Sequence, residues 1–246
     1  MKKNLVTVSV AFLMMLIPLF LGGCAKSESA AIGTSEIVTT YVVQAENGRV
    51  ICQAIFQVGG SLGTYLELSE GEKVYCGDGE RTVELKKTES LFNVVSYAAN
   101  TDLRYEVGRD YTLTFVRKDG QTLVSSIQLP EEVVITAPIA GRTSHKGELL
   151  PVRWIQGNGS SMDVQLLWET ANGQNSTKLR SVEDNGRFNF IDEETRVKDN
   201  SGQLMAGQVS ASVKVTRVVR KGVSPKFRTG TIAGKQSQTV RFTLID

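Results

Sequence analysis

Histidine is almost absent from the sequence, since His145 is the single example in 246 residues. A serine, histidine and acid triad would have to use His145, and no Gly-x-Ser-x-Gly nucleophile motif accompanies it. A single histidine also excludes the zinc sites that take several histidine ligands. His145 lies in a polar segment between Arg142 and Lys146, so we expect a solvated loop residue with no catalytic or metal-binding role.

The sequence also lacks an excess of charge of either sign. The chain has 28 Lys and Arg against 26 Asp and Glu, and Lys2 and Lys3 alone account for the difference. A chain that is otherwise formally neutral gives no electrostatic basis for binding nucleic acid or an anionic lipid surface. The glycine-rich run 58–63 lacks the Gly-Lys-Ser/Thr ending of a phosphate loop. We therefore expect no nucleic-acid partner and no cofactor.

Cysteine occurs three times, and the first, Cys24, ends the run Leu21-Gly22-Gly23-Cys24. Before it come two lysines, an apolar run over 5–21 and two small residues, which is the order of a secretory signal peptide. The segment resembles a bacterial lipoprotein signal, in which the cysteine receives a diacylglyceryl group and the peptide is cut before it. The resemblance implies a signal peptide over 1–23 and a lipid anchor on Cys24. The alternative is a plain transmembrane helix, which the length of the apolar run does not exclude. The Gly-Gly-Cys ending and the polar run after it argue against that alternative.

The residues after Cys24 refine the predicted location. Two or three acyl chains would hold the protein at a membrane of the bacterial cell envelope. Ala25 follows Cys24, whereas an Asp at that place commonly retains Gram-negative lipoproteins at the inner membrane. In a Gram-negative host this favours the outer membrane. The stretch that follows is rich in small and polar residues, so we expect 24–35 to be a lipidated flexible tether.

Cys52 and Cys76 are the other two cysteines. An export signal places them in an oxidising compartment, where an even pair is expected to form a disulfide. The alternative is two unpaired cysteines in a core, because free cysteine is often buried. Their spacing is too long for a CxxC metal or redox motif.

From residue 36 onward apolar residues recur with a period of two, separated by Gly and Asp turns. The clearest case is Tyr111, Leu113 and Phe115, followed by Lys118-Asp119-Gly120-Gln121, which predicts a tight hairpin turn. Short strands at this spacing are typical of β-sandwiches. Pro130 and the two acids after it indicate a boundary, so we predict an N-terminal β-sandwich domain over 36–130 and a second domain over 131–246.

The start of the second half carries a more specific pattern. Ile135-Thr136-Ala137-Pro138 is followed by Gly141 and then by Leu150-Pro151-Val152-Arg153-Trp154. This resembles the start of an immunoglobulin-like or fibronectin-like domain, in which a strand carries a buried Trp. The predicted fold class is therefore all-β, with two β-sandwich domains of which the second is immunoglobulin-like. The whole chain resembles uncharacterised envelope lipoproteins of Gram-negative bacteria, a resemblance that implies no activity and no site residues.

Two charged clusters are the remaining candidates for a site. Asp192, Glu193, Glu194 and Asp199 could supply oxygen ligands to calcium, although no EF-hand spacing is present and Lys198 lies among them. Arg217, Arg220 and Lys221 lie near a turn at Gly222. They form either a solvated hairpin tip or a contact for an acidic partner, such as an envelope protein or a polysaccharide.

These observations favour a non-enzymatic, membrane-anchored lipoprotein that serves as a binding or structural module. β-Sandwiches present loops and edge strands to partners, which suits this function. The alternative is a hydrolase that acts on cell-wall or surface polysaccharide with two carboxylates. Such carboxylates can come from any part of a fold, so the sequence leaves this alternative open.

Overall fold

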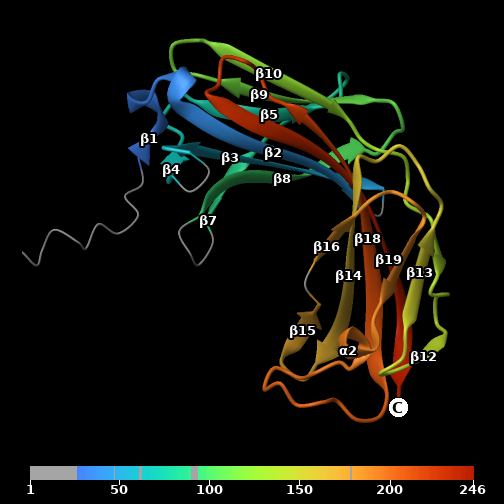
Figure 1. Ribbon diagram of the computed structural model, residues 1–246. Helices are drawn as coiled ribbons and strands as arrows, with labels where there is room; N and C mark the ends of the chain where they lie inside the picture. The colour runs from blue at the N-terminus through green and yellow to red at the C-terminus, as the bar shows by residue number, and fades with distance from the viewer. Residues whose placement is uncertain (1–26, 47, 61–62, 90–93, 178) are drawn as a thin grey trace, which may run out of the picture.

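The computed structural model describes residues 27–246, apart from positions 47, 61–62, 90–93 and 178. Strands dominate this part of the chain, and its helices are η2 (Ser29–Ala31), η3 (Thr34–Glu36) and α2 (Asp192–Thr195). The predicted all-β fold class is confirmed (Figure 1). No helix among the described residues is long and apolar enough to cross a membrane. Cys24 and the predicted signal peptide lie outside the described residues.

The first unit is a sandwich of two sheets. One sheet has the order β10 (Thr122–Gln128), β9 (Asp110–Val116), β5 (Lys73–Gly77) and β6 (Thr82–Glu84). The strands of the first unit that face it belong to a 12-stranded sheet that continues into the second unit. They are β1 (Ser27–Glu28), β2 (Ile37–Glu46), β3 (Arg49–Val58), β4 (Thr64–Glu67), β7 (Lys86–Glu89) and β8 (Val95–Arg104). Alternate residues of β9 and β10 are buried, as expected for strands with one face on a core.

The hairpin predicted between β9 and β10 is confirmed. The Arg117 amide donates to the Gln121 carbonyl at 2.8 Å, and the Asp119 side chain accepts from the Gln121 amide at 2.9 Å. Gly120 has a φ of 83°, which glycine adopts without the cost that a side chain would add. The Asp-Gly pair in the sequence therefore fixes both the position and the shape of this turn.

The second unit is also a sandwich of two sheets. One sheet is β11 (Ile135–Ala137), β13 (Leu150–Trp154) and β17 (Arg187–Phe190). The facing strands are β12 (Thr143–His145), β14 (Ser161–Thr170), β15 (Gly173–Ser176), β16 (Arg180–Val182), β18 (Val209–Gly222) and β19 (Thr229–Ile245). The orders β11-β13-β17 and β14-β18-β19 correspond to strands A-B-E and C-F-G of an immunoglobulin sandwich. Trp154 is buried in the core of this unit, as the sequence predicts.

The two units share one β-ribbon. β18 and β19 pair with each other along fourteen register positions, from Val209↔Leu244 to Gly222↔Thr231. The first part of β19, Thr229 to Ser237, also pairs in parallel with β2 of the first unit, and its last three residues pair in parallel with β12 of the second unit. At about 3.3 Å per residue, the 17 residues of β19 span about 55 Å. The same two strands therefore run through both sandwiches (Figure 1).

This ribbon changes the division of the chain. The sequence assigns all of 131–246 to the second domain, with the boundary near Pro130. In the structure, Phe227 and Ile232 are buried in the first core, where the Phe227 ring stacks on Phe115 with centroids 6.3 Å apart. The tip of the β18–β19 hairpin thus completes the first unit, although it lies nearly a hundred residues beyond the predicted boundary.

The predicted flexible tether also needs correction over its described part. Residues 27–36 form β1, η2 and η3, and the Ser29 side chain is fully buried and hydrogen-bonded to Glu72. The Arg117 guanidinium donates to the carbonyl oxygens of Ser29 and Ile32, at 3.1 and 3.0 Å. The polar groups of this stretch form hydrogen bonds to a buried arginine and a buried glutamate. Its polar composition predicted a flexible tether, but these hydrogen bonds give it a defined structure.

Candidate functional site

The histidine and the acidic cluster both lie in the second unit. His145 is exposed, and its Nδ1 lies 3.1 Å from the backbone oxygen of Asp246. Glu194 accepts from Arg180 at 2.8 Å, and Asp199 accepts from the amides of Ser201 and Gln203. Among the described residues, no group of three or more His, Cys, Asp or Glu side chains is placed to hold a metal ion. The calcium alternative around Asp192 therefore gains no support from the geometry.

Cys52 and Cys76 form the predicted disulfide. Cys52 lies on β3 and Cys76 on β5, so the bond joins the two sheets of the first unit across its core. Their Cα atoms are 6.4 Å apart, and both side chains are fully buried. A disulfide that closes a loop of this length contributes about 3.5 kcal/mol in the chain-entropy model. Its role is structural, since it lies away from the surface.

Arg217 is not the surface residue that the sequence predicts. Its side chain is 1% exposed, and its Nε donates to Asp184 at 2.8 Å. The remaining guanidinium nitrogens donate to the carbonyl oxygens of Glu131, Glu132 and Ile155. Arg217 therefore holds the start of the second unit in place and cannot contact a partner. Arg220 and Lys221 are exposed, and Arg220 donates to the Ser161 hydroxyl at 3.1 Å.

The surroundings of Asp184 show how this buried charge is tolerated. Burial alone would raise the pKa of its carboxyl group, but hydrogen bonds from Trp154, Arg217 and the Gly157 amide hold that pKa below its usual value. A Cβ atom added at Gly157 would lie 2.6 Å from the Arg217 guanidinium, and one at Gly159 would lie 2.5 Å from the Arg217 side chain. The two glycines therefore leave the space that Arg217 occupies.

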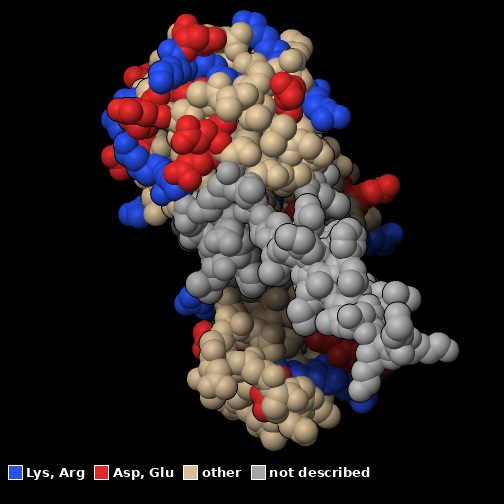
Figure 2. Space-filling model, turned by 90° about the vertical axis from the view of Figure 1, so that its left-hand side faces the viewer, with Lys and Arg blue, Asp and Glu red and all other residues tan. Residues whose placement is uncertain are grey.

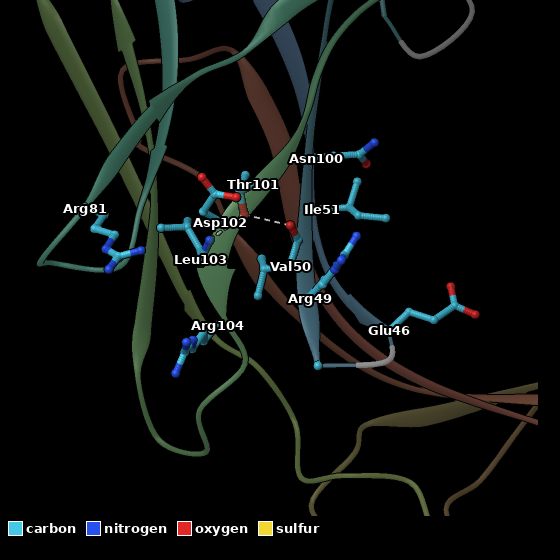
Figure 3. A pocket seen from close by; sticks show the side chains of 11 residues that line it. Glu46, Arg49, Val50, Ile51, Arg81, Asn100, Thr101, Asp102, Leu103 and Arg104 are labelled. Atoms are coloured by element: carbon cyan, nitrogen blue, oxygen red, sulfur yellow. Dashed lines mark hydrogen bonds between the residues drawn. The ribbon is translucent and has the colours of Figure 1, made fainter.

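A large hollow lies on the first unit, at the end of β3 and β8 that adjoins the second unit. This arginine cleft has a volume of about 940 Å³, within the range of ligand-binding pockets. Exposed Arg49 and Ile51 come from β3, exposed Asn100, Asp102 and Arg104 come from β8, and Arg81 comes from the turn between β5 and β6. Buried Val50, Thr101 and Leu103 also line it, and Thr101 donates to the Val50 carbonyl at 2.7 Å (Figure 3).

The three arginines of the cleft lack internal partners. Arg49 lies directly opposite Arg104 in the β3–β8 register, a like-charge arrangement that costs stability in a sheet. Glu46 faces Arg49 in the β2–β3 register, but its carboxylate lies 3.0 Å from Lys214 instead. Among the described residues, the guanidinium groups of Arg49, Arg81 and Arg104 form no hydrogen bond or ion pair. Figure 3 shows them spread along the cleft, with Arg81 near one end and Arg49 toward Glu46.

A rigid turn presents Arg81. The carboxylate of Asp78 accepts from the amides of Glu80 and Arg81, at 3.0 and 2.8 Å, and pairs with Arg109 at 3.2 Å. Burial opposes ionisation here, yet these bonds together hold the pKa of Asp78 below its usual value. A second hollow of about 350 Å³ extends from the cleft past this turn and shares Arg81, Asp102 and Arg104 with it.

Outside the cleft, the visible surface charge is mixed. Figure 2 shows Lys and Arg side chains interspersed with Asp and Glu over the first unit, on the side of β1 and β4, while the visible end of the second unit is mostly uncharged. Neither surface offers a broad patch of one sign. The grouping of three unpaired arginines in a concave site is therefore a local feature.

Sequence patterns did not indicate the arginine cleft. Arg49, Arg81 and Arg104 lie in three separate segments, and none belongs to a recognisable motif. The strand register brings Arg49 and Arg104 together, and the register depends on pairings that a single sequence does not specify. The one available signal was that the strand over 95–104 ends in the alternating polar residues Asn100, Asp102 and Arg104.

Comparison with known proteins identifies no family for this chain. No family model matches, and no curated protein matches. Solved structures that align with it include fibronectin(III)-like modules of Clostridium thermocellum CbhA, at 12% identity and a TM-score of 0.24, over 85% of this chain and 90% of that one.

Two further solved structures also consist of tandem sandwich domains. A two-domain fibronectin type III segment of chicken tenascin aligns at 10% identity and a TM-score of 0.21, over 79% of this chain and 95% of that one. The IG1+IG2 structure of DIP-gamma aligns at 9% identity and a TM-score of 0.22, over 85% and 95%. At these TM-scores the alignments assign neither a family nor a function to the chain.

Proposed function

We propose that this chain is a non-enzymatic lipoprotein of a bacterial envelope that serves as a binding or structural module. The shared β18–β19 ribbon carries this proposal, because two sandwiches joined by continuous strands form a firm body that can hold a partner at a set distance from an anchor. The arginine cleft favours binding over a purely structural role, because its three guanidinium groups form no ion pair with the described residues.

The anchor in this proposal is Cys24, which resembles a lipidated cysteine. Three residue steps separate Cys24 from Ser27, the first residue of β1, and a fully extended chain covers about 10 Å in that distance. Arg117 fixes the residues that follow, through the carbonyl oxygens of Ser29 and Ile32. A lipid on Cys24 would therefore hold the first unit close to the membrane surface, with β1 nearest to it.

The hydrolase alternative receives less support from the cleft. A glycoside hydrolase needs one carboxyl group that remains protonated and a second that is ionised, on either side of the scissile bond. Glu46 and Asp102 are the two carboxylates of the arginine cleft. Glu46 is bound to Lys214 at 3.0 Å, and Asp102 is exposed. Because the ion pair already engages Glu46, the described lining of the cleft offers no pair of free carboxylates.

The test of the anchor is fractionation of cells that produce the full chain or its Cys24→Ser variant. We expect the wild type in the membrane fraction, in the outer membrane of a Gram-negative host, and the variant in the soluble fraction. Cys52 and Cys76 are unchanged, so an intact disulfide in the released variant serves as the control for folding. A variant that stays in the membrane fraction would overturn the lipid anchor.

A further inference from the structure

The arginine cleft has the chemistry of a site for an anion. Arg49 and Arg104 face each other across the β3–β8 register, and no acidic side chain of the described residues pairs with either. A comparable pair occurs in the second unit, where Arg153 lies opposite Arg187. There the Arg153 guanidinium donates to the carbonyl oxygens of Val152 and Phe188 and to the Asn189 side chain. In the second pair, Arg153 is therefore held by acceptors within the protein, whereas no acceptor among the described residues contacts the Arg49 or Arg104 guanidinium.

The spacing of the cleft favours an extended ligand over a single small anion. Its three arginines come from β3, from the β5–β6 turn and from the end of β8, and they lie spread along the hollow (Figure 3). Guanidinium groups bind carboxylate and phosphate oxygens through paired hydrogen bonds. Three guanidinium groups spread along one hollow suit a polymer that carries acidic groups at intervals.

The other lining residues narrow the class of ligand. The described residues that line the cleft include no aromatic side chain, and binding of single-stranded nucleic acid commonly uses aromatic stacking. Asp102 and Asn100 are further exposed polar residues of the lining. The Asp102 carboxylate can accept hydrogen bonds from sugar hydroxyl groups, and the Asn100 amide can both donate and accept.

The position of the cleft argues against a lipid head group. β1 pairs with β4, and β4 pairs with β3 at Gln57 and Val58, while the cleft lies at the Arg49 end of β3. Nine residue steps of β-strand, about 30 Å, therefore separate the predicted anchor side from the cleft. A ligand there would have to reach well above the membrane surface.

We propose that the arginine cleft binds an acidic polysaccharide, with Arg49, Arg81 and Arg104 paired to its carboxylate or phosphate groups and Asn100 and Asp102 bonded to its hydroxyl groups. This proposal deepens the proposed binding function and rests on it. It names the ligand class, and it does not require Cys24 to be lipidated.

The test is calorimetric titration of the full-length protein, purified from membranes in detergent, with alginate and with polygalacturonate, both polymers of carboxylate-bearing sugars. We expect at least one to bind, with an affinity that falls as salt rises because salt screens the charges. Arg49→Gln with Arg104→Gln should weaken binding at least tenfold. The matched control is Arg187→Gln with Arg241→Gln, which removes the same charge from exposed positions of the second unit and should bind like the wild type.

Several results would overturn the proposal. They are binding to neither polymer, equal losses in the cleft and control variants, or equally tight binding of polyglutamate, which would indicate an acidic peptide. Binding of inorganic phosphate alone would indicate a small-anion site. Thermal unfolding of each variant shows whether it folds. Fractionation of Cys24→Ser is independent of these titrations, so failure of the cleft and failure of the anchor can be told apart.

Discussion

The two sandwich units each use one buried arginine in a similar way, and they differ in what else joins their sheets. In the first unit Arg117 pairs with Glu72 through Nε at 2.8 Å and donates to carbonyl oxygens of the leading segment, 29–32. In the second unit Arg217 pairs with Asp184 through Nε at 2.8 Å and donates to carbonyl oxygens of its own leading segment, 131–132.

The difference lies in covalent bonding. The Cys52–Cys76 disulfide joins the facing sheets of the first unit. Both described cysteines are used there, so the second unit depends on its apolar core and on the Arg217 network. In both units a buried arginine fixes the leading segment. The first unit, which is the one nearest the membrane in the proposed arrangement, also has a disulfide that restrains its unfolded state.

The largest effect should come from breaking the Arg217 network. Arg217→Ala leaves the Asp184 carboxylate buried without its cation, and removal of one partner of a buried ion pair costs about 3–5 kcal/mol. We expect the free energy of unfolding of the second unit to fall by that amount, measured by urea denaturation with Trp154 and Trp168 fluorescence as the probe. Both tryptophans lie in the second core.

The control for this prediction lies on the same strand. Arg220 is exposed and makes one hydrogen bond, to Ser161, so Arg220→Ala should change the free energy of unfolding by about 0.5 kcal/mol or less. If both variants lose a similar amount of unfolding free energy, the Arg217 network is not a specific source of stability for the second unit.

A somewhat smaller effect, confined to the first unit, should follow removal of the disulfide. Cys52→Ala with Cys76→Ala should lower the stability of that unit by about 3.5 kcal/mol. Tryptophan fluorescence should report unfolding of the second unit at a nearly unchanged urea concentration. If both units lose stability together, the β18–β19 ribbon couples them into one cooperative transition, and the comparison of separate units fails.

The sequence predicted much of this architecture, because alternation of apolar residues and Asp-Gly turns are local signals. It misplaced Arg217, since a run containing Arg217, Arg220 and Lys221 has the composition of an exposed tip. Arg217 pairs in the core with Asp184, 33 residues earlier in the chain. The pairing of the intervening strands brings the two residues together. The arginine cleft was missed for the same reason. The tether predicted over 24–35 rested on composition, and the contacts that order its described part involve Glu72 and Arg117, far along the chain.

The smallest predicted effect is a dependence of stability on pH, to which one arginine-bound aspartate in each unit contributes. Asp78 and Asp184 both have a pKa held below the usual value, against the opposing effect of burial, by hydrogen bonds and an arginine. A carboxyl group whose pKa is lower in the folded state stabilises the fold at pH above the unfolded pKa. That contribution is lost as the pH falls through the folded pKa. Stability should therefore decline below about pH 4, the region of an ordinary aspartate pKa.

The measurement is urea unfolding at a series of pH values between 5 and 2.5 for the wild type, Asp184→Asn and Asp78→Asn. Asp184→Asn should flatten the acid loss in the second unit and Asp78→Asn that in the first, whereas parallel pH profiles for all three proteins would show that other carboxyl groups determine acid sensitivity.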